Sequence, residues 1–245
     1  MNELLTPEEM ALADRLAIEG GRPGRMLMEA AGLAVADAVA TRHPFGVRIL
    51  ALAGPGNNGG DAYVAARILK ERGYAIEMMA IGDPSAGKGD AALARAGWRH
   101  PVEPADPGRV RGFDVILDGL FGAGLDRALE GQAAALVSAV NASGARVIAI
   151  DLPSGVSGLT GEVLGEAVRA ETTVTFFRRK PGHELLPGRI LCGRITVADI
   201  GIPERVLSVV RPRLFRNVPA VWAGSLPVPR PDGHKYGRGH VVAVS

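Results

Sequence analysis

The stretch that most constrains the fold is a glycine-rich turn at residues 54–61, Gly-Pro-Gly-Asn-Asn-Gly-Gly-Asp. An apolar run from Val47 to Ala53 leads into it, and a helical pattern from Ala62 to Lys70 follows. This order predicts a buried strand that turns through the glycines into a helix, where backbone N–H groups and the helix N-terminus meet. Such a point suits an anion, usually a phosphate. The simpler alternative is a tight turn in which Asp61 caps the helix.

From residue 47 onward, short apolar runs alternate with helical segments. This alternation indicates a parallel sheet that helices cover on both faces. The predicted strands lie at 47–53, 75–81, 114–117, 146–150, 172–177 and 194–199, and the main helices between them at 61–72, 90–96 and 131–143. We therefore expect an α/β fold with six to eight strands in a doubly wound sheet.

Two helices precede the sheet. Thr6-Pro7-Glu8-Glu9 is a capping box with proline at the first helical position, and it predicts a helix that continues to Glu19. A second helix is predicted at 25–41, and its apolar arc is wider than one packing face requires. The excess leaves two interpretations open, contact with a partner subunit or simple core packing.

The C-terminal part changes in character after residue 210. Five prolines fall between residues 211 and 231, which predicts a linker. A new apolar run begins at His240, close to the end of the sequence. We therefore expect three parts: a domain at 1–210, a proline-rich linker at 211–233, and the truncated start of a second domain at 234–245.

Composition excludes several classes of protein. With 47% hydrophobic residues, 22% charged residues and a net charge of +2, the chain has a sizeable core and no basic stripe for nucleic acid. A single cysteine, Cys192, excludes an intramolecular disulfide and is compatible with a reducing compartment. No signal-like or membrane-spanning run is present, and the five histidines form no zinc-binding pattern. These observations predict a soluble cytoplasmic protein.

Two further strands end in an aspartate. Asp118 precedes the glycine-rich loop 119–128, and Asp151 opens the segment Asp-Leu-Pro-Ser-Gly. Doubly wound sheets bind ligands at these strand ends, so Asp118 is either an acid/base group or a cation ligand. The plainer alternative is a carboxylate that accepts hydrogen bonds from nearby backbone. Together with Asn58 and Ser154, the two aspartates form an oxygen-only set that suits Mg²⁺, Ca²⁺ or a monovalent cation.

Two other motifs match known patterns incompletely. Residues 54–59 satisfy G-x-G-x-x-G, but a dinucleotide site also needs an acidic residue at the end of the next strand. Glu77 lies within that strand and Asp83 beyond it. Residues 82–89 resemble a phosphate-binding P-loop, but Gly89 stands where a magnesium-binding Ser or Thr is required. We reject the P-loop, although Lys88 within it remains able to reach a phosphate.

Taken in this order, the motifs resemble the NAD(P)H-hydrate epimerase family, the N-terminal half of bifunctional nicotinamide nucleotide repair proteins. The resemblance covers residues 4–210 and includes Leu5–Met10, Leu27–Gly32, Gly54–Asp61, Asp118–Gly124 and Asp151–Gly155. The tail from His234 resembles the start of the fused ADP-dependent dehydratase, which has a ribokinase-like fold.

The resemblance implies a three-layer α/β/α Rossmann-like fold, usually dimeric, that interconverts the R and S hydrates NADHX and NADPHX at C6 of the nicotinamide ring. It implies that Asn58, Asp118 and Ser154 hold a potassium ion (K+) and that Asp118 is the acid/base. It also implies a substrate site made of Asp151 and two loops, whose residues are Asn57, Asn58, Gly59, Gly60, Asp61, Gly122, Ala123, Gly124, Leu125, Asp126, Arg127 and Ala128. Some relatives use a lysine after the second strand, a role for which only Lys88 is available here.

The chemistry that we expect is loss and re-addition of the hydroxyl through an iminium-like state, assisted by Asp118. Two other functions compete with it. An NAD(P)-dependent dehydrogenase would use the G-x-G-x-x-G turn, but it lacks the acidic partner. A non-catalytic dimeric scaffold of the same fold should have lost its strand-end carboxylates, whereas Asn58, Asp61, Asp118 and Asp151 are all present.

Overall fold

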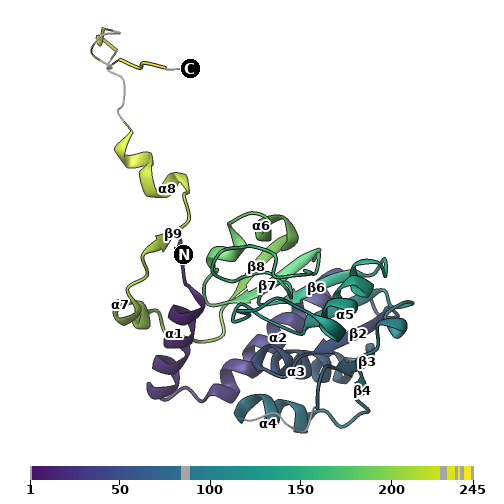
Figure 1. Cartoon of the computed structure of the whole chain (residues 1–245). Helices are drawn as coiled ribbons and strands as arrows, with labels where there is room; N and C mark the ends of the chain where they lie inside the picture. The colour runs from purple at the N-terminus through teal and green to yellow at the C-terminus, as the bar shows by residue number, and fades with distance from the viewer. Residues whose placement is uncertain (1, 84–88, 227–230, 235–236, 238–239, 244–245) are drawn as a thin grey trace.

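The computed structural model describes residues 2–83, 89–226, 231–234, 237 and 240–243 (Figure 1). Within these residues the main sheet has seven strands, all parallel, in the order β4-β3-β2-β5-β6-β7-β8. The strands are β2 Arg48–Ala53, β3 Ala75–Ala80, β4 Glu103–Pro104, β5 Val115–Gly119, β6 Arg146–Ile150, β7 Thr172–Phe176 and β8 Arg194–Ala198. The predicted doubly wound α/β sheet is confirmed.

Helices cover both faces of this sheet. The longer ones are α1 Pro7–Glu19, α2 Gly24–Arg42, α3 Asn57–Glu71, α4 Gly89–Gly97 and α5 Gly131–Asn141, and the short ones are α6 Gly188–Leu191, α7 Leu207–Val210 and α8 Pro219–Trp222. Alternate residues of β2 enter two separate cores: Ile49 and Ala51 pack with α1, α2 and α3, and Leu50 and Leu52 pack with α5. Because both faces of the strand are buried, its sequence is a continuous apolar run.

The sheet reverses its direction of growth beside β2. Strands β3 and β4 follow on one side of β2, and β5 to β8 follow on the other. The carboxyl ends of β2 and β5 therefore flank the switch point, which is where such sheets bind ligands. A Cβ atom on Gly54 would lie 1.7 Å from the carbonyl oxygen of Leu120, so only glycine allows the two strand ends to approach this closely.

Two details of the helices test the sequence predictions. The capping box at Thr6 is present, since the Thr6 hydroxyl accepts from the Glu9 N–H at 3.2 Å and the Glu9 carboxylate accepts from the Thr6 N–H at 2.9 Å. Helix α3, however, begins at Asn57 with Gly56 as its N-cap. The alternative in which Asp61 caps the helix is therefore wrong. Gly59 permits the earlier start, because a Cβ there would lie 2.0 Å from the carbonyl oxygen of Gly54.

The C-terminal segment returns to the N-terminus before it leaves the body of the protein. Strand β9, Leu214–Phe215, pairs antiparallel with β1, Glu3–Leu4. Beyond β9 the chain extends away from the sheet (Figure 1). The division at 1–210, 211–233 and 234–245 remains a prediction. No helix in the described part of the chain is long and apolar enough to cross a bilayer.

Candidate active site

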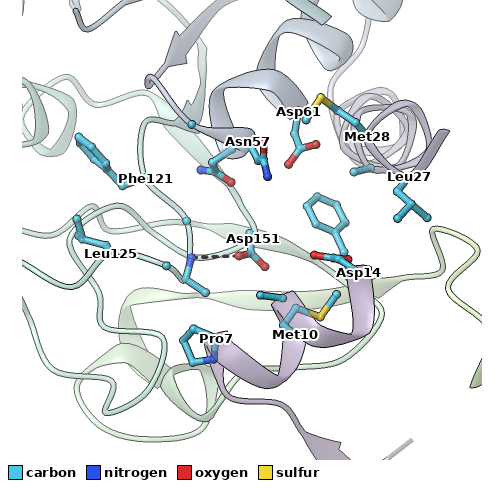
Figure 2. Close-up of a pocket in the computed structure, with 18 of the residues that line it drawn as sticks. Pro7, Met10, Asp14, Leu27, Met28, Asn57, Asp61, Phe121, Leu125 and Asp151 are labelled. Carbon is cyan, nitrogen blue, oxygen red and sulfur yellow. Dashed lines mark hydrogen bonds between the residues drawn. The ribbon is translucent and has the colours of Figure 1, made fainter. Parts of the chain in front are cut away.

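A cavity of about 540 Å³ lies at the carboxyl edge of the sheet, over the switch point (Figure 2). Its walls are helices α1 and α2, the first turn of α3, the loop 120–127, and the residues that follow β6 and β7. This volume is in the range of pockets that hold small molecules.

The first turn of α3 supplies one wall. Gly56, Asn57 and Asn58 line the cavity there, and no side chain caps this helix end. The uncapped N–H groups and the helix dipole together favour an anion. Both polar atoms of the Asn58 side chain are buried without a hydrogen-bond partner. Since buried amides are normally paired, Asn58 is available for a ligand.

Asp151, directly after β6, is held by a dense set of contacts. Its Oδ1 accepts hydrogen bonds from Lys180 Nζ at 2.6 Å and from Thr175 Oγ1 at 2.9 Å, and its Oδ2 accepts from the Ala123 N–H at 3.1 Å. Burial alone would raise the pKa of Asp151, but the Lys180 charge and these hydrogen bonds overcome it and lower the pKa to about 2. Asp151 is therefore ionised at neutral pH.

The backbone of Asp151 is strained. Its φ angle is +63°, in the left-handed region that residues with side chains adopt uncommonly. His183, in the 3₁₀ turn Pro181–His183, fixes this geometry. The His183 Nδ1 accepts from the Lys180 N–H at 2.9 Å, so its Nε2 carries the proton and donates to the Asp151 carbonyl at 2.8 Å. Burial lowers the pKa of His183 to about 4, which keeps the ring neutral.

Two more carboxyl groups face the same cavity. Asp61 comes from α3 and Asp14 from α1, and Figure 2 shows both side chains directed into the cavity near Asp151. Burial, together with the charges of Asp151 and Asp14, raises the pKa of Asp61 well above its usual value. Burial likewise raises the pKa of Asp14 to about 6, with a smaller contribution from Asp151 and with Lys180 opposing. The protonated form of Asp61 is thus favoured relative to an exposed aspartate.

Asp118 and Ser154 lie one layer behind the cavity wall. Both are fully buried, and neither lines the cavity. The Asp118 carboxylate accepts from the Ser154 hydroxyl at 2.6 Å and from the Ser154 N–H at 2.8 Å, and the Ser154 hydroxyl accepts from the Phe121 N–H at 2.9 Å. Burial raises the pKa of Asp118 to about 6 against the effect of these hydrogen bonds. The pair holds the loop that forms the front wall.

Most of the residues expected to bind the substrate line the cavity, namely Asn57, Asn58, Asp61, Gly122, Ala123, Gly124, Leu125, Asp126, Arg127 and Asp151. Gly59, Gly60 and Ala128 do not line it. Lys88 lies outside the described residues.

Sequence reasoning missed Asp14 and Lys180. The available signal for Lys180 was its position shortly after the end of β7, where ligands are expected. Asp14 offered a weaker signal, a carboxylate one turn after the buried Met10 on the inward face of α1.

The oxygen atoms around Gly122 test whether a cation fits. A Cβ on Gly122 would lie 3.1 Å from both Asn58 Oδ1 and Asp151 Oδ2, so these two oxygens converge beside the loop. Within the described residues, no group of three or more His, Cys, Asp or Glu side chains is arranged to hold a metal. The donors nearby are an unpaired amide oxygen, a hydroxyl and carboxylates, a chemistry that fits a weakly charged hard cation such as K⁺.

Fold and site together define a class: a doubly wound α/β protein with an uncapped helix N-terminus and a carboxylate cluster at its switch point. Residues 24–182 match the family described as YjeF-related protein N-terminus. The chain is 38% identical over 201 residues to an NAD(P)H-hydrate epimerase of Limosilactobacillus fermentum (80% of this chain, 96% of the relative). It is 43% identical over 187 residues to one of Achromobacter xylosoxidans (73% and 88%). The chain therefore belongs to the YjeF-related N-terminus family, which includes these NAD(P)H-hydrate epimerases. This confirms the resemblance found in the sequence.

Two further comparisons concern length and fold. The chain is 40% identical over 252 residues to a bifunctional NAD(P)H-hydrate repair enzyme Nnr of Thermofilum pendens, and the match covers 97% of this chain but only 47% of that protein. The chain thus spans about half the length of this bifunctional relative. The crystal structure of yeast ynu0 superimposes with a TM-score of 0.71 at 22% identity, covering 85% of this chain and 93% of the yeast chain, and shows the same fold.

Proposed function

We propose that this chain interconverts the R and S epimers of NADHX and NADPHX at C6 of the nicotinamide ring. Family membership supports this activity, because relatives of similar length are named NAD(P)H-hydrate epimerases. The observation that carries the proposal is the cavity itself. It joins an uncapped helix N-terminus, suited to a pyrophosphate, to three carboxyl groups and a lysine, suited to proton transfer beside a cationic ring.

The substrate would lie in this cavity with its two ends on different walls. Its pyrophosphate would lie against the N–H groups of Asn57 and Asn58, with the loop 122–127 over it and Arg127 supplying a positive charge. Gly59 and Gly60 would contribute by allowing the turn to pack closely, and Ala128 by ending the loop, rather than by contact. The nicotinamide end would then reach Asp151.

The reaction needs no oxidant or reductant. C6 carries a hydroxyl and is bonded to the ring nitrogen, whose lone pair can expel a protonated hydroxyl as water. The resulting iminium-like ring is planar at C6, and water added to its other face gives the opposite epimer. The ionised Asp151 would stabilise the positive charge that develops, as a fixed charge in a partly dry site does effectively.

Asp118 has a supporting role in this proposal. Because it is buried behind the wall, it would act through Ser154 and the backbone of Phe121, which set the position of the loop. Asn58, Asp118 and Ser154 would hold a potassium ion, which would supply a fixed positive charge at this edge of the cavity. Replacing K⁺ by tetramethylammonium in the assay below should then lower the rate, and an unchanged rate would remove the ion from the proposal.

A coupled assay tests the activity. A mixture of R and S NADHX is incubated with an S-specific dehydratase and its nucleotide, and NADH absorbance is followed with and without this chain. We expect about half of the hydrate to be recovered rapidly without the chain and all of it with the chain. If a folded chain changes nothing, the epimerase proposal fails and a non-catalytic scaffold becomes the better interpretation. An Asp151→Asn variant is the matched control for contaminating activity.

We further propose that residues 234–245 begin a dehydratase domain, as the long alignment with the bifunctional relative supports. A homodimer is supported by exposed apolar side chains on α1 and α2, Ile18, Met26 and Leu33. Sedimentation analysis of the purified chain tests the dimer.

A further inference from the structure

Asp14 and Asp61 differ from Asp151, the third carboxyl group described in this cavity, in having no partner to bond. Asp151 is paired with Lys180 and Thr175, whereas neither Asp14 nor Asp61 has a hydrogen bond or an ion pair to any residue that the structure describes. Asp61 is nonetheless only 9% exposed. Because its carboxyl group lines the cavity and has no protein partner, Asp61 is available to a ligand there.

The two groups also come from different walls. Asp61 projects from the first turns of α3, beside the switch point, and Asp14 projects from α1, which covers the cavity from the other side (Figure 2). Both lie within electrostatic range of Asp151 and Lys180. A planar ring placed beside Asp151 would therefore have one free carboxyl group towards each face.

Inversion at C6 through a planar intermediate requires two proton transfers on opposite faces. On the first face an acid must protonate the departing hydroxyl, and on the second a base must accept a proton from the incoming water. A single carboxyl group could serve only one face, and return of water to that face would restore the starting epimer.

We propose that Asp61 and Asp14 are the catalytic acid/base pair of the epimerase, each serving one face of the ring. The inference rests on the proposed function. In one direction, the Asp61 carboxylic acid gives its proton to the hydroxyl, the C6–O bond breaks, and water leaves. A water on the other face then bonds to C6 and gives a proton to the Asp14 carboxylate. The reverse reaction begins from the protonation state that this leaves.

Neighbouring charges and burial shift the pKa values of Asp61 and Asp14 in a way that suits these two roles. Burial and the neighbouring Asp151 and Asp14 raise the pKa of Asp61 well above its usual value against the effect of Lys180, and this shift favours its protonated form. Burial raises the pKa of Asp14 to about 6, again with Lys180 opposing, so Asp14 is largely a carboxylate at neutral pH. The charged groups that face the pair are Asp151 and Lys180, and Asp90 of α4 also lines the cavity.

Oxygen exchange gives a test that a structural role would not satisfy. Each epimer of NADHX is incubated in H₂¹⁸O with the wild type, Asp14→Asn or Asp61→Asn, and both inversion and ¹⁸O at C6 are measured by chromatography and mass spectrometry against an enzyme-free control. Glu19→Gln on α1 and Glu71→Gln on α3 are matched variants with exposed side chains outside the cavity. Thermal unfolding and hydrate binding verify that the variants remain folded and competent.

We expect the wild type to exchange oxygen as it inverts. Each aspartate variant should invert at least about 100-fold more slowly. Each should still exchange oxygen without inversion, Asp61→Asn for the epimer whose hydroxyl faces Asp14 and Asp14→Asn for the other. The matched variants should behave as the wild type does.

Other outcomes overturn the pair. Wild-type inversion without ¹⁸O uptake would leave the epimerase function standing and reject dehydration and rehydration. Full inversion by either variant, the same exchanging epimer in both, or loss of all exchange in both would reject the one-face assignment. If the wild type does not invert the substrate at all, the proposed epimerase function is rejected, and the assignment of Asp61 and Asp14 as its acid/base pair is rejected as well.

Discussion

Replacing Lys180 by methionine should be severely destabilising, because it isolates a buried charge. The Lys180 side chain is 2% exposed and that of Asp151 18% exposed, and their charged atoms are 2.6 Å apart. Methionine retains most of the apolar length of lysine but none of its charge. Removing one partner of a buried ion pair typically costs about 3–5 kcal/mol. Because Asp151 keeps its bonds to Thr175 and Ala123, we expect a loss near the lower end, about 3 kcal/mol of unfolding free energy.

The dependence of this loss on pH identifies its cause. In the wild type the pKa of Asp151 is lowered from 3.8 to about 2, so the pair contributes about 2 kcal/mol above pH 4 and loses it as the pH falls through 2. In Lys180→Met, burial is left largely unopposed and raises the pKa of Asp151. A raised carboxyl pKa has the opposite sign, since stability is then gained as the pH falls through the folded-state value. The deficit of the variant should therefore shrink on acidification.

Urea unfolding at several pH values between 4 and 8 measures this directly. The double variant Lys180→Met/Asp151→Asn is the control, because it removes both charges and should recover much of the lost stability. A loss below about 1 kcal/mol, or a deficit that does not change with pH, would refute the assignment of Lys180 as the charge that keeps Asp151 ionised.

Three further predictions follow from the same geometry. Gly54→Ala should lower stability by more than about 2 kcal/mol in thermal unfolding, since its Cβ would meet the Leu120 carbonyl, whereas Gly56→Ala, whose Cβ meets nothing within 4 Å, should be tolerated. Ser154→Ala should cost about 1–3 kcal/mol in urea unfolding, because it leaves the buried Asp118 carboxylate without its hydroxyl partner. The pKa of Asp118, already raised to about 6, should then rise further in this variant. Carboxyl chemical shifts measured by NMR against pH would detect the change.

The sequence was sufficient to predict the fold and the wall of the cavity formed by the loops that follow β2 and β5. Continuous apolar runs that alternate with helices specify a parallel sheet, and the glycine turn marks the strand next to the switch point. Loops 54–61 and 119–128 could therefore be assigned to one edge of the sheet before any coordinates. The error at the start of α3 arose locally, because Asn and Gly usually favour turns, yet here tertiary packing places them in a helix.

The other side of the site could not be predicted. Asp14 reaches the cavity only because α1 folds back over the sheet edge, and nothing near Asp14 in the chain indicates that contact. Lys180 meets Asp151 across a separation of 29 residues, through a turn whose geometry depends on the buried His183. Contacts of this kind are set by tertiary packing, which neither periodicity nor spacing records.

The two strand-end aspartates illustrate why motif and role are different. Asp118 and Asp151 have the same context in sequence, an apolar strand before and a glycine-containing loop after. In the structure Asp118 is fully buried, whereas the Asp151 side chain is partly exposed to the cavity. Burial raises the pKa of Asp118 to about 6, and the hydroxyl and N–H of Ser154 only moderate it. Lys180 reverses the same effect at Asp151 and lowers its pKa to about 2. Asp151 thereby becomes a fixed negative charge facing the cavity, while Asp118 holds the loop that encloses the cavity. The difference comes from a single lysine that follows another strand.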